Sequence, residues 1–237
     1  MNQIIEANTF EGLFTLYKSK EFRRMQQESR PSQERANNFR LKFFLIDWWR
    51  RRRATVTVRD MTPLLNRIST SDRVVDLLCG QEDILEKTMM HIWEKNPRAI
   101  AIGIDNQTDV SSRILRKNIA FCRGDATKTD IPDHSVDLVL ICYGLQVLGS
   151  AHRDDLFKEV RRILAPGGSA IFMEVLKLKD EKKNEKNRKE HNFWNSNAPY
   201  FILEDNAWVK YIEENGFRVE TSTYVIDRSK AYLAHPL

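Results

Sequence analysis

Acidic residues follow several apolar, strand-like runs of this sequence. Asp105 ends the run 99–105, and Asp125 follows the run 119–122 after a short turn. In an open parallel sheet, ligands bind beyond the carboxyl ends of the strands, where an acid can accept hydrogen bonds from both hydroxyls of a ribose. Asp105 lies about 25 to 30 residues beyond the loop that follows the preceding strand, a plausible βαβ length. The alternatives are that Asp105 caps a helix and that Asp125 is an ordinary turn acid.

Three further residues have side chains that could accept a proton. Tyr143 follows the run 136–141, and His152 and His191 lie farther along the chain. A positioned tyrosine or histidine can act as a general base, but a lone histidine is more often a capping or surface residue. The sequence has no spacing typical of a zinc site, a phosphate-binding loop or a serine triad, so we expect no metal.

Alternating strands and helices must position these residues. From Arg73 onward, short runs rich in Val and Ile alternate with helical segments. This order predicts a doubly wound α/β fold with a mostly parallel sheet and right-handed crossovers. The expected strands are 74–78, 99–105, 119–122, 136–141, 170–175, 217–226 and 231–235, and the expected helices are 84–94, 110–117 and 208–215, the last ended by Gly216.

The segment from Gly124 to Val175 carries an ordered set of motifs. Gly124-Asp125-Ala126 is followed by Val136-Asp137 at a strand start, by the pair Gly144-Leu145, and by a Leu-x-Pro-Gly-Gly turn over 164–168. This order resembles the second half of a class I S-adenosylmethionine-dependent methyltransferase, in particular the ubiquinone/menaquinone C-methyltransferase type. The resemblance runs from about Asp72 to Phe217. It implies a Rossmann-like fold with a seven-stranded, mostly parallel sheet, and S-adenosyl-L-methionine as the cofactor.

The resemblance also implies roles for individual residues. In the family, the acid after the third strand contacts the adenine amine and the next backbone N–H contacts the ring, which assigns these roles to Asp125 and Ala126. Asp105 would bind the ribose, and 141–145 would line the gap between sulfonium and substrate. The expected cofactor-binding residues are Asp76, Leu78, Gly80, Asp105, Asn106, Asp125, Ala126, Cys142 and Tyr143, and the catalytic candidates are Tyr143, His152 and His191.

The first loop departs from the family pattern. After an acid that corresponds to Asp76, the family has glycines at every second position, because the chain passes close under the methionine portion of the cofactor. Only Gly80 matches here, since Leu78 and Glu82 occupy the other glycine positions. We therefore expect this loop to hold the cofactor less closely. The alternative is an ordinary strand-to-helix turn.

The first 70 residues read as a helical region distinct from the sheet. Apolar residues recur at helical spacing over 10–17 and 39–49, and another helix is expected over about 57–68 with Pro63 inside it. We expect 1–70 to form an N-terminal helical cap or lid and 71–237 to form the methyltransferase domain. In that domain, 177–190 is rich in Lys, Glu and Asn and reads as a solvated, mobile part of an insertion over 177–200. The cap and the insertion would cover the substrate. The side chains of Trp48, Trp49 and Trp194 would either wall an apolar pocket or pack helices on the sheet.

The composition limits the class of protein. A chain of 237 residues, 41% hydrophobic and 30% charged, suits one domain with an appendage. We see no apolar run long enough to span a membrane and no secretory signal at the N-terminus. The three cysteines have no metal-ligand spacing and fit a reduced compartment, so we expect a cytoplasmic protein. The net charge of +5 permits several kinds of partner and identifies none.

These observations favour a methyltransferase that acts on a small, partly apolar molecule by in-line methyl transfer. One alternative, motivated by Leu78 and Glu82, is a degenerate methyltransferase fold that serves as a binding or regulatory subunit. Another is an RNA-modifying or RNA-binding protein, because Trp48 and Trp49 directly precede four arginines at 50–53. Those arginines can equally be the basic end of an amphipathic helix.

Overall fold

Runs rich in Val, Ile and Leu form the central parallel strands because both of their faces are buried. The computed structural model describes residues 9–28, 40–68, 70–80, 83–106, 118–195, 200–225 and 228–237. In this part of the chain the sheet has seven strands in the order β3-β2-β1-β4-β5-β7-β6. The first five run parallel, and β7 pairs antiparallel with both β5 and β6. The strands are β1 (Arg73–Leu77), β2 (Ile100–Asp105), β3 (Ile119–Arg123), β4 (Val136–Cys142), β5 (Leu164–Val175), β6 (Phe217–Val225) and β7 (Ser229–Pro236).

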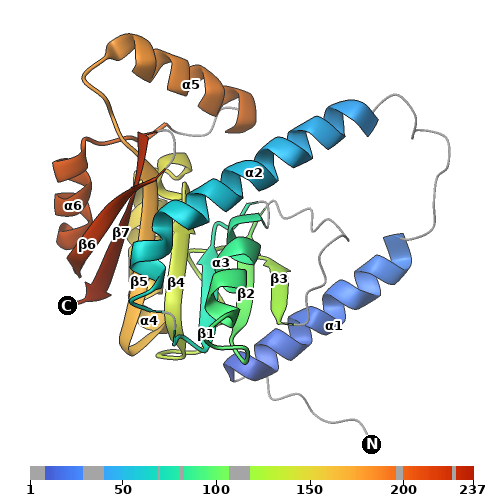
Figure 1. Cartoon of the computed structure of the whole chain (residues 1–237). Coiled ribbons are helices and arrows are strands. Elements are labelled where there is room, and N and C mark those ends of the chain that lie inside the picture. Colours follow the sequence, from blue (N-terminus) through green and yellow to red (C-terminus); the bar gives the residue numbers. More distant parts are fainter. Residues whose placement is uncertain are drawn as a thin grey trace, which may run out of the picture.

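The helices lie on both faces of this sheet, and each face has its own apolar core (Figure 1). On one face, α2 and α3 contribute Met61, Leu65 and Met89. On the other face, α1, α4 and α6 contribute residues such as Leu13 and Trp208. The prediction of a doubly wound, mostly parallel seven-stranded sheet is therefore confirmed. The helices are α1 (Phe10–Glu28), α2 (Arg40–Leu65), α3 (Asp83–Trp93), the short 3-10 helix η1 (Leu145–Val147), α4 (Ser150–Ile163), α5 (Glu181–Asn195) and α6 (Asp205–Glu214).

Helix α2 is longer than the sequence predicts. The expected break before a third helix is wrong, because one helix runs from Arg40 through Pro63 to Leu65. Pro63 stands in the last turn, where the missing N–H and the ring disturb little of the helix. Contacts with β6 fix the course of α2, since the Thr223 hydroxyl donates to the Asp60 carbonyl (3.5 Å) and Arg67 pairs with Glu220. The first half of α2 extends beyond the sheet (Figure 1).

Most of the segment that the sequence predicts to be a mobile insertion forms helix α5. Ion pairs one turn apart, Lys183–Asp180 (3.4 Å) and Lys189–Glu185 (3.9 Å), suit a helix that charged residues alone do not reveal. The amide of Asn184 exchanges hydrogen bonds with the backbone of Leu178, which anchors the start of α5. Figure 1 shows α5 beyond the edge of the sheet at which β5 ends.

The remaining expected elements agree with the structure to within a few residues, except at two places. Strand β5 begins at Leu164, so it includes the Pro-Gly-Gly turn that was expected to precede the strand. The expected helix 110–117 lies outside the described residues. Gly216, with φ +85°, follows α6 as expected of a helix stop. Among the described residues, no helix is both long and apolar enough to cross a membrane.

The packing of α1 leads to a stability prediction. Leu13 is 3% exposed and lies in the core on the face of α4 and α6. Leu13→Ala should lower the free energy of unfolding by about 2–4 kcal/mol, because it removes buried methyl groups and leaves a cavity. Thr15→Ala, on the exposed side of the same helix, should change it by less than about 0.5 kcal/mol. Urea unfolding of both variants checks this, and equal stabilities would mean that α1 is not docked on the sheet.

Candidate functional site

The carboxyl ends of the parallel strands bring most of the predicted residues to one edge of the sheet. Asp105 ends β2, and its Oδ2 accepts a hydrogen bond from the backbone N–H of Gly80, 2.9 Å away in the loop after β1. The N–H groups of Leu78 and Cys79 both donate to the Ile104 carbonyl. The end of β2 therefore holds the first loop in place through the Asp105 side chain and the Ile104 backbone carbonyl. Gln81 and Glu82 lie outside the described residues.

Leu78 occupies a backbone conformation that glycine prefers. Its φ is +61°, and a left-handed residue other than glycine costs about 1–2 kcal/mol. Its side chain lies over Gly144, where an added Cβ would be 2.6 Å from Cδ1 of Leu78. The absence of a side chain at Gly144 thus makes room for the one at position 78. This pairing explains how the chain accommodates its departure from the glycine pattern.

A buried carboxyl group and a partly buried thiol lie behind the first loop. Asp76 on β1 is 1% exposed, and burial raises the pKa of its carboxyl well above its usual range, with the neighbouring Asp105 adding to the effect. Its Oδ1 has no hydrogen-bond partner among the described residues. Burial also raises the pKa of the Cys142 thiol at the end of β4, and Asp76 and Glu174 act in the same direction. A raised pKa disfavours the thiolate, so Cys142 is not a candidate nucleophile.

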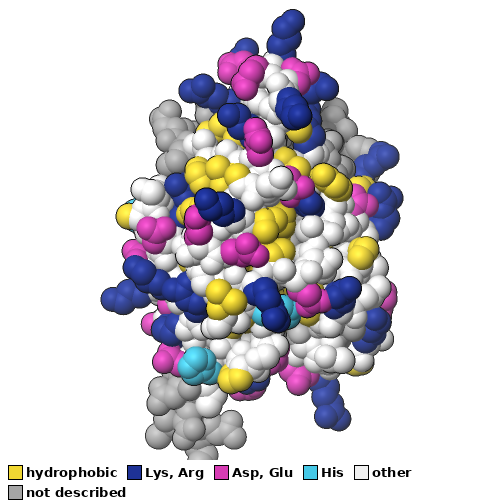
Figure 2. Space-filling view, turned by 90° about the vertical axis from the view of Figure 1, so that its left-hand side faces the viewer, with side chains coloured by type: hydrophobic (Ala, Val, Ile, Leu, Met, Phe, Trp, Pro, Cys, Tyr) yellow, Lys and Arg dark blue, Asp and Glu magenta, His cyan; other side chains and the backbone are white. Residues whose placement is uncertain are grey.

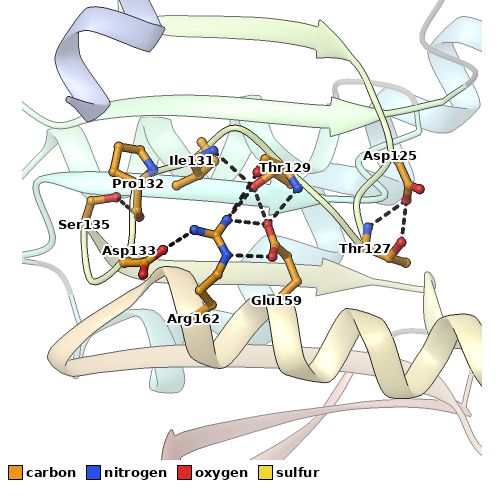
Figure 3. Close-up of polar contacts among 9 residues, drawn as sticks. All are labelled: Asp125, Thr127, Thr129, Ile131, Pro132, Asp133, Ser135, Glu159 and Arg162. Atoms are coloured by element: carbon orange, nitrogen blue, oxygen red, sulfur yellow. Dashed lines mark hydrogen bonds and ion pairs between the residues drawn. The ribbon is translucent and has the colours of Figure 1, made fainter. Parts of the chain in front are cut away.

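Asp125 lies after β3 at the same edge and is exposed. Its Oδ1 accepts hydrogen bonds from the N–H (2.8 Å) and the hydroxyl (2.7 Å) of Thr127, as Figure 3 shows. These bonds hold the pKa of Asp125 below its usual range against the opposing effect of burial, and His152 and Lys128 lower it further. The structure thus brings His152, in the first turn of α4, to the Asp125 side of the site. The next residue, Ala126, is buried.

An ion-pair network ties the loop after Asp125 to α4 (Figure 3). Glu159 accepts hydrogen bonds from the N–H (2.7 Å) and the hydroxyl (2.6 Å) of Thr129, and its carboxylate also pairs with Arg162. Arg162 reaches Asp133 on the far side of the loop. Glu159 is only 6% exposed, so the pair is partly shielded from water. The network fixes the loop that carries Asp125, and sequence spacing alone gave no sign of it.

Tyr143 and Glu174 define the end of the site at β4 and β5. Tyr143 follows β4 with φ +62°, a second left-handed residue beside Leu78, and its N–H donates to the Met173 carbonyl (2.7 Å). Glu174 on β5 is fully buried, and its Oε1 accepts the N–H of Leu145 (2.8 Å). Burial raises the pKa of Glu174 to about 8, against the lowering effect of the Leu145 N–H and its neighbours. The sequence analysis missed Glu174, although an acid inside the apolar run 170–175 was a usable signal.

The other predicted residues are less closely grouped. Asn106 follows Asp105 and is exposed, and its carbonyl accepts a hydrogen bond from Arg123 (2.9 Å). The side chains of Trp48, Trp49, His191 and Trp194 lie outside the described part of the structure. In the described ranges, no group of three or more His, Cys, Asp or Glu side chains could hold a metal ion.

The face of the molecule on the side of α6, β6 and β7 is mixed in charge. Figure 2 shows a charged top at the height that α5 has in Figure 1, with hydrophobic side chains gathered below it. Lysines, arginines and acids alternate over the rest of this face. An interspersed pattern of this kind gives no single-sign field of the sort that steers nucleic acid.

Comparison with known proteins adds independent information. Residues 74–168 match a family model described as a methyltransferase domain. Two ubiquinone/menaquinone biosynthesis C-methyltransferases named UbiE are similar: that of Pseudomonas savastanoi pv. phaseolicola is 27% identical over 121 residues, and that of Ectopseudomonas mendocina is 29% identical over 118 residues. Each match covers 48% of this chain and 45% of the relative, so the chain spans about half the length of these relatives.

Two solved structures have the same fold. Human N-acetylserotonin methyltransferase in complex with SAM is 16% identical with a TM-score of 0.60, over 95% of this chain and 67% of that one. A SAM-dependent methyltransferase from Aquifex aeolicus is 15% identical with a TM-score of 0.58, over 78% of this chain and 93% of that one. At these identities the likeness establishes the fold.

The close approach of Leu78 and Gly144 predicts that substitutions at the two positions are coupled. Gly144 has φ −84° and ψ −40°, which alanine adopts easily, so the cost of Gly144→Ala comes from overpacking against Leu78 and should be about 1–3 kcal/mol. In a Leu78→Gly background this cost should fall by about 1 kcal/mol or more. Gly149→Ala, whose Cβ would meet its nearest atom at 3.8 Å, is the control. The wild type, the two single variants and the double variant form a double-mutant cycle. If the changes in unfolding free energy are additive in this cycle, the contact between Leu78 and Gly144 is contradicted.

The buried Glu174 predicts a pH dependence of stability. Its pKa is about 8 in the folded protein and ordinarily 4.5, so its favourable contribution is full below about pH 4.5 and is lost as the pH rises through about 8. Glu174→Gln should therefore flatten the fall in stability between these pH values by on the order of 3 kcal/mol. Asp76 acts in the same direction in both proteins, so the difference between their urea-unfolding curves isolates Glu174. Parallel curves across this pH range would show that Glu174 is not buried as described.

Proposed function

We propose a methyltransferase function for this chain, whose residues 74–168 form a class I S-adenosylmethionine-dependent methyltransferase domain. The proposed reaction is in-line transfer of a methyl group from S-adenosyl-L-methionine to a small, partly apolar molecule. The observation that carries the proposal is the meeting of Gly80, Asp105 and Asp125 at the carboxyl edge of the parallel strands. This is the edge at which doubly wound sheets bind their ligands.

The residues at this edge fit the cofactor. Gly80 has φ +52° and open space around its Cα, which allows the backbone to approach a ligand closely. The buried Oδ1 of Asp76 has no partner among the described residues and would accept a hydrogen bond from the methionine amino group. Asp105 keeps hydrogen-bonding capacity for the ribose while it holds Gly80, because a carboxylate offers about four lone-pair sites.

The remaining assignments follow the order of the strands. Asp125 would accept the adenine amine through the oxygen that Thr127 does not use, and the N–H of Ala126 would meet the ring. Leu78, Cys142 and Tyr143 would lie along the methionine and sulfonium portion, with Asn106 beside the ribose. When bound, the cofactor supplies a methyl group on a positively charged sulfur. Orientation of the acceptor opposite that sulfur supplies much of the rate.

Tyr143 is the candidate proton acceptor best placed for this reaction, since it follows β4 between the first loop and Glu174. His152 lies beside Asp125, and we assign it to the adenine side of the site. His191 stays a candidate from the sequence alone. Because the electrophile is already positively charged, a strong base is not needed for every acceptor.

The first half of α2 and the segment around α5 are the proposed cover on the acceptor side. Ala54 and Thr57, at the start of the second half of α2, are 3% and 1% exposed, so the helix is packed against the protein directly after the proposed cover. The N–H of Phe201, after α5, donates to the Gln146 carbonyl of η1 (3.0 Å). The packing of α2 and this hydrogen bond support a cover that excludes water and orients the acceptor. The division into a helical region 1–70 and a domain 71–237 is retained as part of this proposal, with α1 as a fixed element.

The names of the similar proteins bear on the chemical nature of the acceptor. The UbiE relatives are named for C-methylation in ubiquinone and menaquinone biosynthesis, which supports an apolar acceptor. The RNA alternative rests on the run 48–53, of which only the Arg52 side chain is described, as exposed. A cytoplasmic location stays a prediction from the sequence.

A second candidate function is that of a binding or regulatory subunit. The observation that favours it is Leu78, whose side chain fills space next to Gly144 that a glycine at position 78 would leave empty. Such a subunit would bind the cofactor weakly or not at all. Cofactor affinity therefore separates the two candidates.

The proposed adenine contact predicts the effect of Asp125→Ala. Loss of a hydrogen bond to a charged group should weaken the binding of S-adenosylhomocysteine by about 1.5–3 kcal/mol, or roughly ten- to a hundredfold. Asp130→Ala, an exposed acid on the same loop, should leave the affinity unchanged. Calorimetric titration of the three proteins measures this. If the wild-type chain binds and Asp125→Ala binds equally well, the adenine assignment is wrong.

A further inference from the structure

Glu174 is a fully buried carboxyl group for which the proposed reaction gives no role. It stands near the end of β5 in the apolar run Ile171-Phe172-Met173-Glu174-Val175. Burying a carboxyl group is costly unless it is hydrogen-bonded, so a position of this kind requires a specific partner. The partner here is the backbone that follows β4.

Three successive backbone N–H groups face this carboxyl. The N–H of Leu145 donates to Oε1 at 2.8 Å, and those of Gln146 and Gly144 also lower its pKa. In the neighbouring position on β5, the Met173 carbonyl accepts the N–H of Tyr143 (2.7 Å). Two adjacent residues of β5 thus hold the backbone from Tyr143 to Gln146.

The held segment has an uncommon conformation and a tight fit. Tyr143 has φ +62°, which costs free energy and persists only where its surroundings impose it. Gly144 contacts Leu78 so closely that an added Cβ would be 2.6 Å from it. A shift of the segment would therefore move Tyr143 and Leu78 together.

Charged groups on the other elements complete the surroundings of Glu174. Arg153 of α4 lowers the pKa of Glu174, and Glu174 raises the pKa of the partly buried Cys142 thiol at the end of β4. On β7, Lys230 is the cross-strand partner of Glu174 but forms an ion pair with Asp205 at 2.6 Å. Glu174 also contributes to the raised pKa of Tyr232 on the same strand. Among the described residues, none of these groups forms an ion pair with Glu174, and its main hydrogen-bond donor is the Leu145 N–H.

We propose that Glu174 is a positioning residue that fixes the backbone of Gly144–Gln146 and thereby sets Tyr143 and Leu78 on the acceptor side of the site. The expected effect on cofactor binding rests on the proposed function. The fixing of the backbone by Glu174 does not. A carboxylate binds an N–H more strongly than a carboxylic acid does, so the hold tightens as Glu174 loses its proton.

Hydrogen exchange of the full chain tests the fixing directly. Glu174→Leu should raise the exchange of the amides over 143–148 by about tenfold or more, because the acceptor of the Leu145 N–H is lost. Glu174→Gln, which keeps an amide oxygen as acceptor, should raise it less. Glu159→Gln is the matched control: it should loosen 127–131 and leave 143–148 as in the wild type. If Glu174→Leu does not fold, the exchange rates over 143–148 are compared between Glu174→Gln and Glu159→Gln. They should be raised in Glu174→Gln alone.

Titration with S-adenosylhomocysteine tests the consequence for the site. Glu174→Leu should bind about tenfold more weakly than the wild type, with partial rescue in Glu174→Gln. The wild-type affinity should also change as the pH rises through about 8, a change that Glu174→Gln lacks. If the amides over 143–148 exchange in both Glu174 variants as slowly as in the wild type, the inference is overturned. Absence of binding to the wild-type chain contradicts the proposed function instead, and the exchange result still decides the role of Glu174.

Discussion

The hydrogen bond between the Gly80 N–H and the Asp105 carboxylate is the contact on which the geometry of the site depends. It joins the loop after β1 to the end of β2 at 2.9 Å, while the Ile104 carbonyl receives two more N–H groups of the same loop. Asp76 lies next to Asp105, and the two carboxyl groups would repel each other if both were charged. Burial raises the pKa of Asp76 well above its usual range and Asp105 adds to the effect, which favours the protonated form of Asp76 and reduces this repulsion. The loop can therefore lie close to the sheet edge and still leave an acceptor for a ligand.

The substitution of leucine for a family glycine has consequences well beyond the loop. Leu78 and Tyr143 both have left-handed backbones, at the ends of two strands that are neighbours in the sheet. Gly144 provides the space that Leu78 uses, and Glu174 holds the backbone that carries Gly144. The first loop, the end of β4 and the end of β5 therefore act as one unit. Its strain is offset by buried hydrogen bonds, and its shape determines how much room remains for the methionine portion of a cofactor.

The amino-acid sequence was sufficient to predict the fold and the edge at which the candidate site lies. Buried parallel strands produce continuous apolar runs, and the acids at their ends stand out against them, as with Asp105 and Asp125. The helical state of α5 was not predictable from its charges, because it depends on anchoring by Asn184 and on pairs between side chains. The pairing of Leu78 with Gly144 joins residues 66 positions apart in the chain, and no local pattern reports such a contact. Glu174 could have been noticed as an acid in an apolar strand, but its partner could not.

The most direct test of the account is hydrogen exchange of the wild-type chain with and without S-adenosyl-L-methionine. Bound cofactor should slow exchange in four segments that follow four different strands and meet at the carboxyl edge of the sheet, namely 76–80, 104–106, 124–127 and 142–146. Segments at the opposite edge, such as 134–136, should be unaffected. Unchanged exchange at a saturating concentration, or protection confined to another surface, would contradict the claim that this edge is a methyltransferase site.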